Sequence, residues 1–343
     1  MDFLHAIFED QLELRLEKGN AVIGGTIFPP VVILKADNAA YDSEYLDWLN
    51  FHWLPDQNEL LERILKIRAN RNRFYDLCKA LKNGQVIPFV GSGMSVPSGL
   101  KTWSNFLLSI RGFSRMSDEE LKRLLAESEF EEAAERLLQS MPPRLFNEQV
   151  EHSLRIDGSK KIDGAVRFLP ELFDKLVLTT NLDDLLENLY NSSNRFDHIF
   201  AGNEIRKYRM TKTISKRVLI KLHGDCKDPE GRVLRKDEYN KAYAEGSQIR
   251  EELINLLKTN SLLFLGCSLD KDRTVSLAAE IAKADPAMPR NYAFLQCPDN
   301  EDICLEREHF LTDCSIFPIW YQADHDECIQ SLFTGMLQCL GKL

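Results

Sequence analysis

The chain has 343 residues, of which 44% are hydrophobic and 28% charged, and its formal net charge is -10 at pH 7. That length is enough for a large buried core, in one big domain or two modest ones. The negative charge argues against broad binding to nucleic-acid backbones, which depends on Lys and Arg, but it leaves room for a local basic pocket for one dinucleotide.

The N-terminus, the hydropathy and the cysteines indicate the cellular compartment in which we expect the protein. No apolar run approaches the roughly 20 residues that span a bilayer. The first five residues include an acidic residue and form no basic segment, so we expect no secretory signal. The eight cysteines are dispersed and no two form a CxxC pair, which favours reduced thiols in a cytoplasmic protein and no zinc site.

Residues 1–70 differ in pattern from the rest and are interpreted as an N-terminal extension. An amphipathic opening helix is followed by a strand-like run, Val31 to Leu34. An aromatic cluster comes next, comprising Tyr41, Tyr45, Trp48, Phe51 and Trp53. Two interpretations of this cluster stay open: a small core, or an exposed surface for an oligomer or a partner.

Residues 71–343 alternate between short apolar runs and helical segments, which predicts an α/β fold with a Rossmann-like, doubly wound parallel sheet. The predicted strands are Val86 to Val90, Leu176 to Thr180, Val218 to Leu222, Ser261 to Cys267, Tyr292 to Gln296 and Ile316 to Trp320. The predicted helices are Ser117 to Gln139, Asp183 to Tyr190, Ile249 to Lys258, Thr274 to Ala284 and Asp326 to Leu340. Residues of about 101–172 form a mainly helical insertion, which we expect to lie over the crevice.

Polar or glycine-rich segments follow four of the predicted strands. They are Gly91 to Ser95, Thr180 to Asp184, His223-Gly224 and Gly266 to Leu269. Open parallel sheets bind ligands at the carboxyl ends of their strands, so this arrangement predicts a nucleotide crevice.

Each of these segments also has a purely structural interpretation. The glycine loop lacks the third glycine of the dinucleotide fingerprint, since Val96 stands there, and it can be an ordinary turn. Asn181 or Asp183 can be the N-cap of the helix that starts at Leu185. His223 can be a satisfied core histidine, although it alone among seven histidines follows a buried strand and precedes a glycine. Cys267 has no base or cation beside it in sequence, which favours a packed residue over a catalytic thiol.

Taken together, the four segments resemble motifs of the sirtuin-like family. Gly91 to Leu100 is similar to the family's glycine-alanine-glycine loop, and Thr180 to Asp183 to its glutamine-asparagine-isoleucine-aspartate motif. His223-Gly224 is similar to the catalytic histidine-glycine, and Gly266 to Leu269 to the glycine-threonine-serine stretch. The order and spacing fit over roughly residues 77–335.

Two departures from deacylating sirtuins narrow the resemblance. The chain lacks the zinc module of two CxxC pairs, and Thr180 stands where the motif has glutamine. Both features resemble the bacterial sirtuin-like NAD hydrolases of antiphage defence, such as those of Thoeris, short-Argonaute and HerA-associated systems. The missing zinc module argues against a peptide groove and therefore against deacylation.

The resemblance implies cleavage of NAD+ to nicotinamide and ADP-ribose, with no metal, and depletion of NAD in antiphage defence after activation by assembly or a partner. It implies that Asn181 holds the nicotinamide ribose or the water, and that His223 acts as a base. The residues implied in binding NAD+ are Gly91, Ser92, Gly93, Ser95, Thr102, Trp103, Thr180, Asp183, Gly266, Cys267 and Ser268.

Other functions and partners follow from the same reasoning. An NAD-dependent protein deacylase and a non-catalytic NAD-sensing scaffold subunit are the alternatives. By family analogy we expect a homo-oligomer and a HerA-type ATPase or another defence partner. No membrane association and no direct sequence-specific nucleic-acid binding are expected.

Overall fold

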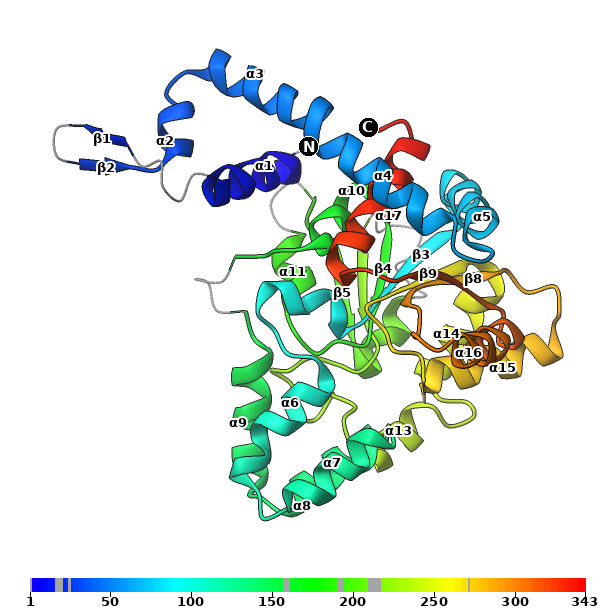
Figure 1. The fold of residues 1–343 in the computed structure, drawn as a ribbon. Helices are drawn as coiled ribbons and strands as arrows, with labels where there is room; N and C mark the ends of the chain where they lie inside the picture. Colours follow the sequence, from blue (N-terminus) through cyan, green and yellow to red (C-terminus); the bar gives the residue numbers. More distant parts are fainter. Residues whose placement is uncertain are drawn as a thin grey trace.

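A seven-stranded sheet, in which every described pairing is parallel, forms the centre of the computed structural model of the protein (Figure 1). The structure describes residues 2–15, 21–23, 26–156, 161–190, 194–208, 217–270 and 272–343. The strand order is β5-β6-β4-β3-β7-β8-β9. The strands are β3 (Val86–Val90), β4 (Leu176–Thr179), β5 (His198–Ala201), β6 (Val218–Lys221), β7 (Ser261–Leu265), β8 (Asn291–Gln296) and β9 (Ile316–Tyr321).

This topology confirms the predicted Rossmann-like parallel fold, and each of the six predicted strands is present within one or two residues of its expected bounds. The edge strand β5 was not predicted. It has four residues, and both His198 and Ile199 are exposed, so it lacks the continuous apolar run by which buried strands are recognised.

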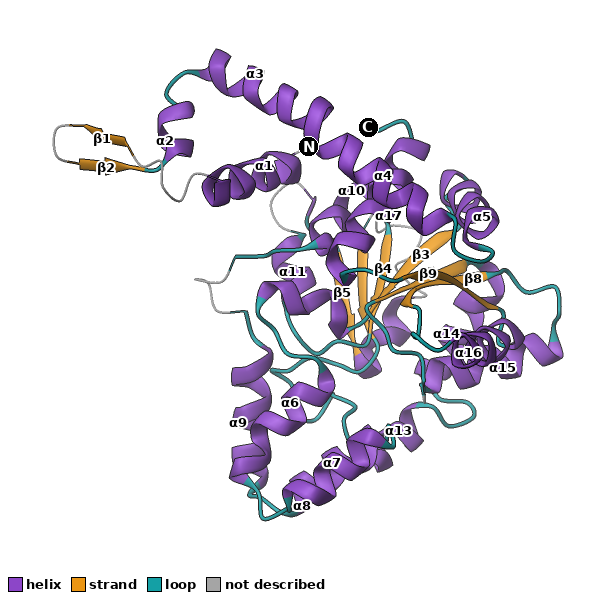
Figure 2. Cartoon of the chain, in the orientation of Figure 1, coloured by secondary structure: helices purple, strands orange, loops and turns teal. Residues whose placement is uncertain are grey.

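Helices cover both faces of the sheet, as Figure 2 shows. Along β7, Leu263 and Leu265 belong to one core and Leu262 and Phe264 to the other, as the two-residue period of a strand requires. The first core contains residues of α4 (Leu54–Leu65), α5 (Asn70–Lys82), α10 (Leu169–Leu172), α11 (Leu185–Leu189) and α17 (His325–Cys339). The second contains residues of α14 (Gln248–Thr259), α15 (Arg273–Ala284) and α16 (Glu301–Asp313).

The helical insertion has a core of its own, which also includes Leu182 and Cys226 from the loops after β4 and β6. The single helix predicted over Ser117 to Gln139 is wrong, because the chain turns at Ser128, whose φ is +58°. Two helices result. The insertion comprises α6 (Trp103–Ile110), α7 (Asp118–Ala126), α8 (Phe130–Gln139) and α9 (Pro143–Leu154), and α13 (Lys236–Ala242) packs against α8.

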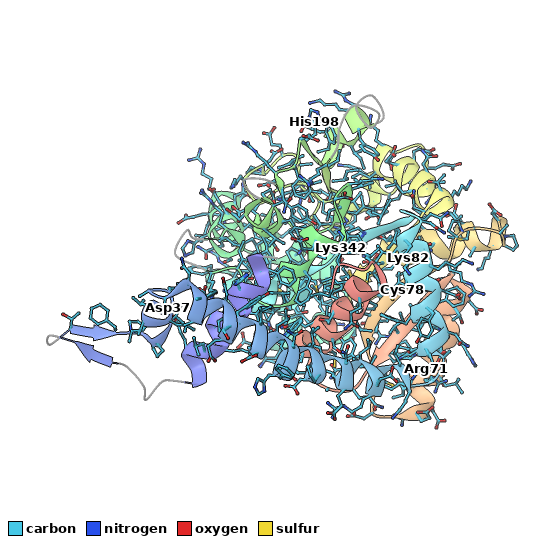
Figure 3. The ribbon with its side chains drawn as sticks, turned by 90° about the horizontal axis from the view of Figure 1, so that it is seen from above. Asp37, Arg71, Cys78, Lys82, His198 and Lys342 are labelled. Atoms are coloured by element: carbon cyan, nitrogen blue, oxygen red, sulfur yellow. The ribbon has the colours of Figure 1, made fainter. Side chains whose placement is uncertain are left out.

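The N-terminal segment forms an arm that projects from the body and ends in a two-stranded hairpin (Figures 1 and 3). The predicted strand at Val31 to Leu34 is wrong: these residues lie in a short helix that begins at Pro30, where proline is well suited to a first turn. Asp37 accepts hydrogen bonds from the backbone N–H groups of Ala39 and Ala40 and so starts the next helix. The arm comprises α1 (Asp2–Arg15), β1 (Ala21–Ile23), β2 (Thr26–Phe28), α2 (Pro30–Leu34) and α3 (Asn38–Trp48).

The aromatic cluster is largely core. Tyr45, Trp48 and Trp53 are buried, and the Trp53 ring lies 6.3 Å from that of Phe168 in the main body. Phe51 is the exception, with 72% of its surface exposed. The extension is therefore anchored on the body through its aromatic side chains.

Candidate active site

A cavity of about 870 Å³ opens at the carboxyl ends of β3, β4, β6 and β7, within the size range of ligand pockets. We call it the carboxyl-edge cavity. Its walls come from the strand-end loops, the helical insertion, α13 and α15. Of the thirteen residues implied by the resemblance, all except Ser95 line it: Gly91, Ser92, Gly93, Thr102, Trp103, Thr180, Asn181, Asp183, His223, Gly266, Cys267 and Ser268.

Ser95 lies behind the wall, fully buried, and holds two of the lining residues. Its hydroxyl donates to Asp183 Oδ2 at 3.0 Å and accepts from the amide Nδ2 of Asn181 at 3.2 Å. The backbone N–H of Asn181 donates to the Thr179 hydroxyl (2.9 Å), which itself donates to the carbonyl of Val90 (2.7 Å). The backbone of Asn181 is thus fixed to β4 and, through Thr179, to β3, and its side-chain amide is fixed by Ser95.

The capping alternative for Asn181 is not what the structure shows. Asp183 Oδ1, rather than the Asn181 side chain, accepts a hydrogen bond from the N–H of Leu185 at the start of α11 (3.2 Å). Burial raises the pKa of Asp183 to about 6, although Leu185, Lys221 and Ser95 each act to lower it. The carboxyl at the base of the cavity therefore changes protonation near physiological pH.

His223 follows β6, the strand next to the one that Asn181 follows. Thr179 of β4 pairs with Lys221 of β6, and Asn181 and His223 each follow their paired residue by two positions. The imidazole Nε2 lies 2.8 Å from the hydroxyl of Tyr243, and Nδ1 lies 3.4 Å from that of Tyr239. Burial lowers the pKa of His223 to about 3, so its ring is neutral at pH 7 and keeps one nitrogen that can accept a proton.

Tyr239 and Tyr243 also line the cavity, and neither was expected there from the sequence. Glu238 accepts hydrogen bonds from the backbone N–H groups of Leu234 and Arg235, both at 2.9 Å, and so fixes the start of α13. The four-residue spacing of the tyrosines then places them on one helix face, toward His223. Burial raises the pKa of both phenols, which stay protonated at neutral pH. The four-residue spacing of two tyrosines in the segment after His223 was the feature of the sequence that could have indicated them.

The glycines are required by the close approach of two loops. A Cβ on Gly93 would lie 2.8 Å from the Cα of Gly266, and one on Gly91 would lie 2.6 Å from the Sγ of Cys267. The N–H of Gly91 donates to the carbonyl of Leu265 at 2.8 Å, and that of Gly93 to the carbonyl of Gly266 at 3.0 Å. The loops after β3 and β7 are thus bonded to each other and form one wall of the cavity.

Cys267 is packed into this wall, as the sequence indicated. Its Sγ lies 3.8 Å from the carbonyl oxygen of Phe89 and 3.6 Å from that of Leu265. Burial raises the pKa of the thiol, which is therefore protonated and a weak nucleophile at neutral pH.

Ion pairs connect the insertion to the rest of the body at the mouth of the cavity. The guanidinium of Arg273, at the start of α15, contacts Glu131 of α8 through two hydrogen bonds, at 2.8 and 2.5 Å. It also donates to Asn240 of α13 at 3.0 Å. Arg273 and Glu131 both line the cavity, and neither was singled out from the sequence.

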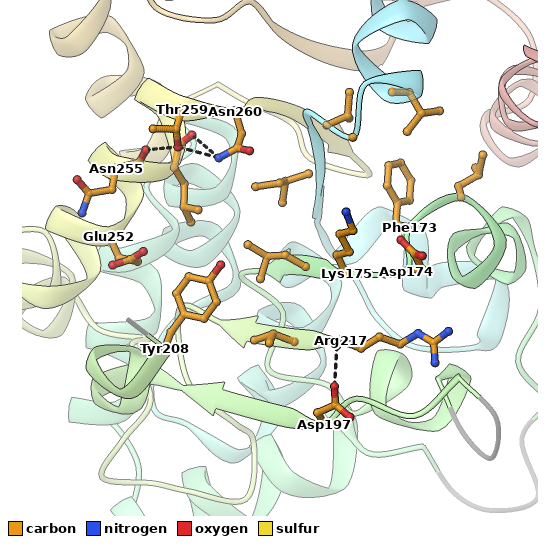
Figure 4. A pocket seen from close by; sticks show the side chains of 18 residues that line it. Phe173, Asp174, Lys175, Asp197, Tyr208, Arg217, Glu252, Asn255, Thr259 and Asn260 are labelled. Carbon is orange, nitrogen blue, oxygen red and sulfur yellow. Dashed lines mark hydrogen bonds between the residues drawn. The ribbon is translucent and has the colours of Figure 1, made fainter. Parts of the chain in front are cut away.

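A second, larger cavity of about 1210 Å³ lies at the other end of the sheet (Figure 4). We call it the amino-edge cavity, because residues at the starts of β3, β4 and β6 line it. Its polar residues include Lys175, Asp197, Arg217 and Glu252, and its floor is aliphatic. None of the motif residues contributes to its lining.

Within the described residues no group of three or more His, Cys, Asp or Glu side chains is arranged to hold a metal ion. In the same part of the chain, no helix is both long and apolar enough to cross a bilayer. All eight cysteines are free thiols.

Comparison with known proteins gives two similarities. Residues 175–319 match the model of the SIR2-like domain, a stretch that contains Asn181, His223 and Gly266 but begins after the Gly91 loop. The chain is also 23% identical over 195 residues to the NAD(+) hydrolase ThsA of Acinetobacter baumannii (strain 532279). That alignment covers 57% of this chain and 38% of the relative, so it spans well under two thirds of the relative's length. The chain therefore carries a SIR2-like domain match from the start of β4 into β9, which confirms the resemblance predicted from its motifs.

Proposed function

We propose that this protein hydrolyses NAD+ to nicotinamide and ADP-ribose in the carboxyl-edge cavity. The observation that carries the proposal is the placement of Asn181 and His223 at equivalent positions beyond two adjacent parallel strands, on one cavity with the glycine loops. The ThsA relative bears the name of an NAD(+) hydrolase, which agrees with this assignment.

The reaction needs little covalent help from the protein. The bond between C1′ of the ribose and the nicotinamide nitrogen breaks, and nicotinamide leaves as a neutral molecule with the bonding electrons. The ribose passes through an oxocarbenium-like state, to which one water adds. The site must fix the sugar, stabilise its developing positive charge and accept the proton that the water releases.

The named residues suit these tasks. The neutral His223 takes the proton of a ribose hydroxyl, whose oxygen then accepts the proton that the water releases, and the Asn181 amide, fixed by Ser95, holds the nicotinamide ribose or the water. Asp183 contacts the carboxamide of nicotinamide. The loops that contain Gly91, Gly93 and Gly266, with Ser92, Cys267 and Ser268, bind the pyrophosphate and adenosine, and Thr102, Trp103 and Thr180 complete the site, while Ser95 holds Asn181 and Asp183 from behind the wall.

The direct test is release of nicotinamide from NAD+ by the purified protein and by its assembled complex. We expect His223→Ala to lower the rate at least about 100-fold, which is the lower range for a positioned base. Turnover at the wild-type rate in this variant, or no turnover by protein and complex alike, would contradict the proposal.

Two further measurements separate the alternative functions. Removal of an acyl group from an acyl-lysine peptide, with formation of O-acyl-ADP-ribose, would indicate a deacylase. Thermal stabilisation by NAD+ without release of nicotinamide would indicate a non-catalytic sensing subunit.

The setting is also part of the proposal. We place the protein in the cytoplasm, as a homo-oligomer that depletes NAD in antiphage defence after activation by assembly or a partner such as a HerA-type ATPase. Residues 71–343 would form the catalytic domain and residues 1–70 the contact surface, which agrees with the exposed Val32 and Leu46 on the arm and Phe51 just after it. Native mass measurement after a pull-down tests this assembly.

A further inference from the structure

Lys221, the last residue of β6, is a buried cation that the proposed chemistry does not use. Its side chain is 1% exposed. An ammonium group removed from water is destabilising by several kcal/mol unless charges and hydrogen bonds compensate it. The contacts that compensate Lys221 therefore show what the residue does.

The ammonium of Lys221 has three short contacts, equal to its number of N–H donors. Nζ donates to Glu187 Oε1 and to Asp225 Oδ2, both at 2.6 Å, and to the backbone carbonyl of Asp183 at 2.8 Å. The carbonyl of Leu182 lies further away, at 3.4 Å.

These contacts join the two loops that bear the proposed catalytic residues. Leu182 and Asp183 directly follow Asn181, and Asp225 lies two residues after His223. A backbone hydrogen bond from the N–H of Cys226 to the carbonyl of Leu182, at 3.0 Å, connects the same loops.

We propose that Lys221 is a positioning residue for NAD+ hydrolysis, which sets the relative placement of the Asn181 and His223 loops by binding Asp183, Glu187 and Asp225 at once. The proposal rests on the proposed function, and it adds a residue that touches none of the reacting atoms. Lys221 acts from beneath the cavity, since it does not line the wall itself.

The charges around Lys221 give it a second effect, on Asp183. Lys221 from β6 acts to lower the pKa of Asp183, whereas Glu187 from α11 acts with burial to raise it. The buried charge of Glu187 is in turn compensated by Lys221, which donates to Oε1, whereas Oε2 is buried without a hydrogen-bond partner among the described residues. Loss of the ammonium therefore raises the pKa of Asp183 and keeps that carboxyl protonated to higher pH.

The test needs a variant that folds. Lys221→Met alone leaves the charges of Glu187 and Asp225 unpaired, and breaking a buried pair in this way is strongly destabilising. The triple variant Lys221→Met, Glu187→Gln, Asp225→Asn replaces all three charges with neutral groups of similar size. Lys227→Met is the matched control, since Lys227 is 47% exposed and pairs with Asp184 of the same loop at 3.1 Å.

We expect the triple variant to unfold cooperatively, yet to hydrolyse NAD+ with kcat at least about 10-fold lower, as displacement of catalytic groups by a fraction of an ångström would cause. The effect of Lys221 on the pKa of Asp183 is larger than that of Glu187, so removing both charges raises this pKa. The acidic limb of the pH–rate profile should therefore move to higher pH, an effect that a purely structural role would not produce. Lys227→Met should stay within about twofold of wild type. A folded triple variant with wild-type kcat and pH profile would overturn the proposal.

The outcome can be separated from failure of the proposed function. If the wild-type protein and its complex release no nicotinamide, hydrolysis is wrong, and NAD+ affinity by calorimetry becomes the measurement. Binding at least about fivefold weaker in the triple variant than in wild type would support positioning of the two loops. Equal affinity, or no binding to the wild-type protein, would overturn it.

Discussion

The two cavities at opposite ends of the sheet differ in what they bring together. The amino-edge cavity is the larger, at about 1210 Å³ against about 870 Å³. Its Asp174 and Lys175 side chains are exposed at the surface, and Glu252 of α14 is its buried carboxylate. The carboxyl-edge cavity instead contains buried Asn181, Asp183 and His223, which hydrogen bonds hold from behind.

This difference separates the two cavities more clearly than their volumes do. In a parallel sheet the strands deliver their following loops to the same edge, so side chains from distant parts of the chain converge there. Burial then shifts the pKa of Asp183 upward and that of His223 downward. Perturbed titration of neighbouring groups in a cavity is a mark of function.

The strongest test of the comparison replaces one asparagine in each cavity with alanine. Asn181→Ala should lower the rate of NAD+ hydrolysis about 100- to 1000-fold, the range for removing one electrostatic group from a reacting centre. Asn255→Ala, in the amino-edge cavity, should leave the rate within about twofold, because Asn255 is exposed on α14. Nicotinamide release under saturating NAD+ measures both.

The reverse result would break the comparison. If Asn255→Ala abolished turnover while Asn181→Ala remained active, the larger cavity would be the site of the reaction. Cooperative unfolding of both variants must be checked first, so that a loss of rate is not a loss of fold.

A second pair of variants compares the backbone of the two cavities. Gly266 and Gly84 line the carboxyl-edge and amino-edge cavities respectively, and both have a positive φ, +65° and +68°. A Cβ on Gly266 would lie 2.5 Å from the backbone nitrogen of Met94, whereas one on Gly84 would meet nothing within 4 Å. We expect Gly266→Ala to lower the free energy of unfolding by about 2–4 kcal/mol and Gly84→Ala by about 1 kcal/mol.

Urea unfolding of both variants measures this difference. Equal losses would mean that backbone conformation alone matters at these glycines, and that the wall formed by the loops after β3 and β7 can move apart. A selective loss for Gly266→Ala would show that the wall is rigid, as binding of a pyrophosphate by backbone groups requires.

Much of the fold followed from the sequence because buried parallel strands are continuous apolar runs. β3, β7 and β9 are all of this type and were predicted. β5 was missed because two of its four residues are exposed at the sheet edge. Val31 to Leu34 was misassigned because a short run of β-branched residues looks alike in a strand and in a helix started by proline.

The lining of the candidate site was predicted where strand ends carry recognisable motifs, and it was missed where side chains come from other elements. Asn181, His223 and the glycine loops needed only the topology of the sheet to converge. Tyr239 and Tyr243 come from a helix whose place over His223 depends on tertiary packing against the insertion. Lys221 reads in sequence as one more strand residue, and only its contacts reveal a buried ammonium.

The smallest expected effect concerns the acid stability that burial of His223 implies. Its pKa is lowered to about 3 in the folded protein from an ordinary value of 6.5, so its contribution to stability is complete above pH 6.5 and is lost progressively as the pH falls toward 3. Between pH 7 and pH 5 this amounts to about 2 kcal/mol of unfolding free energy, which His223→Gln should not lose. The control is His198→Gln, because His198 is an exposed histidine and the first residue of the edge strand β5 (Figure 3). Urea unfolding at the two pH values measures the difference. An identical pH dependence in wild type and His223→Gln would mean that the imidazole is solvated, as the exposed Lys175 at the amino-edge cavity is.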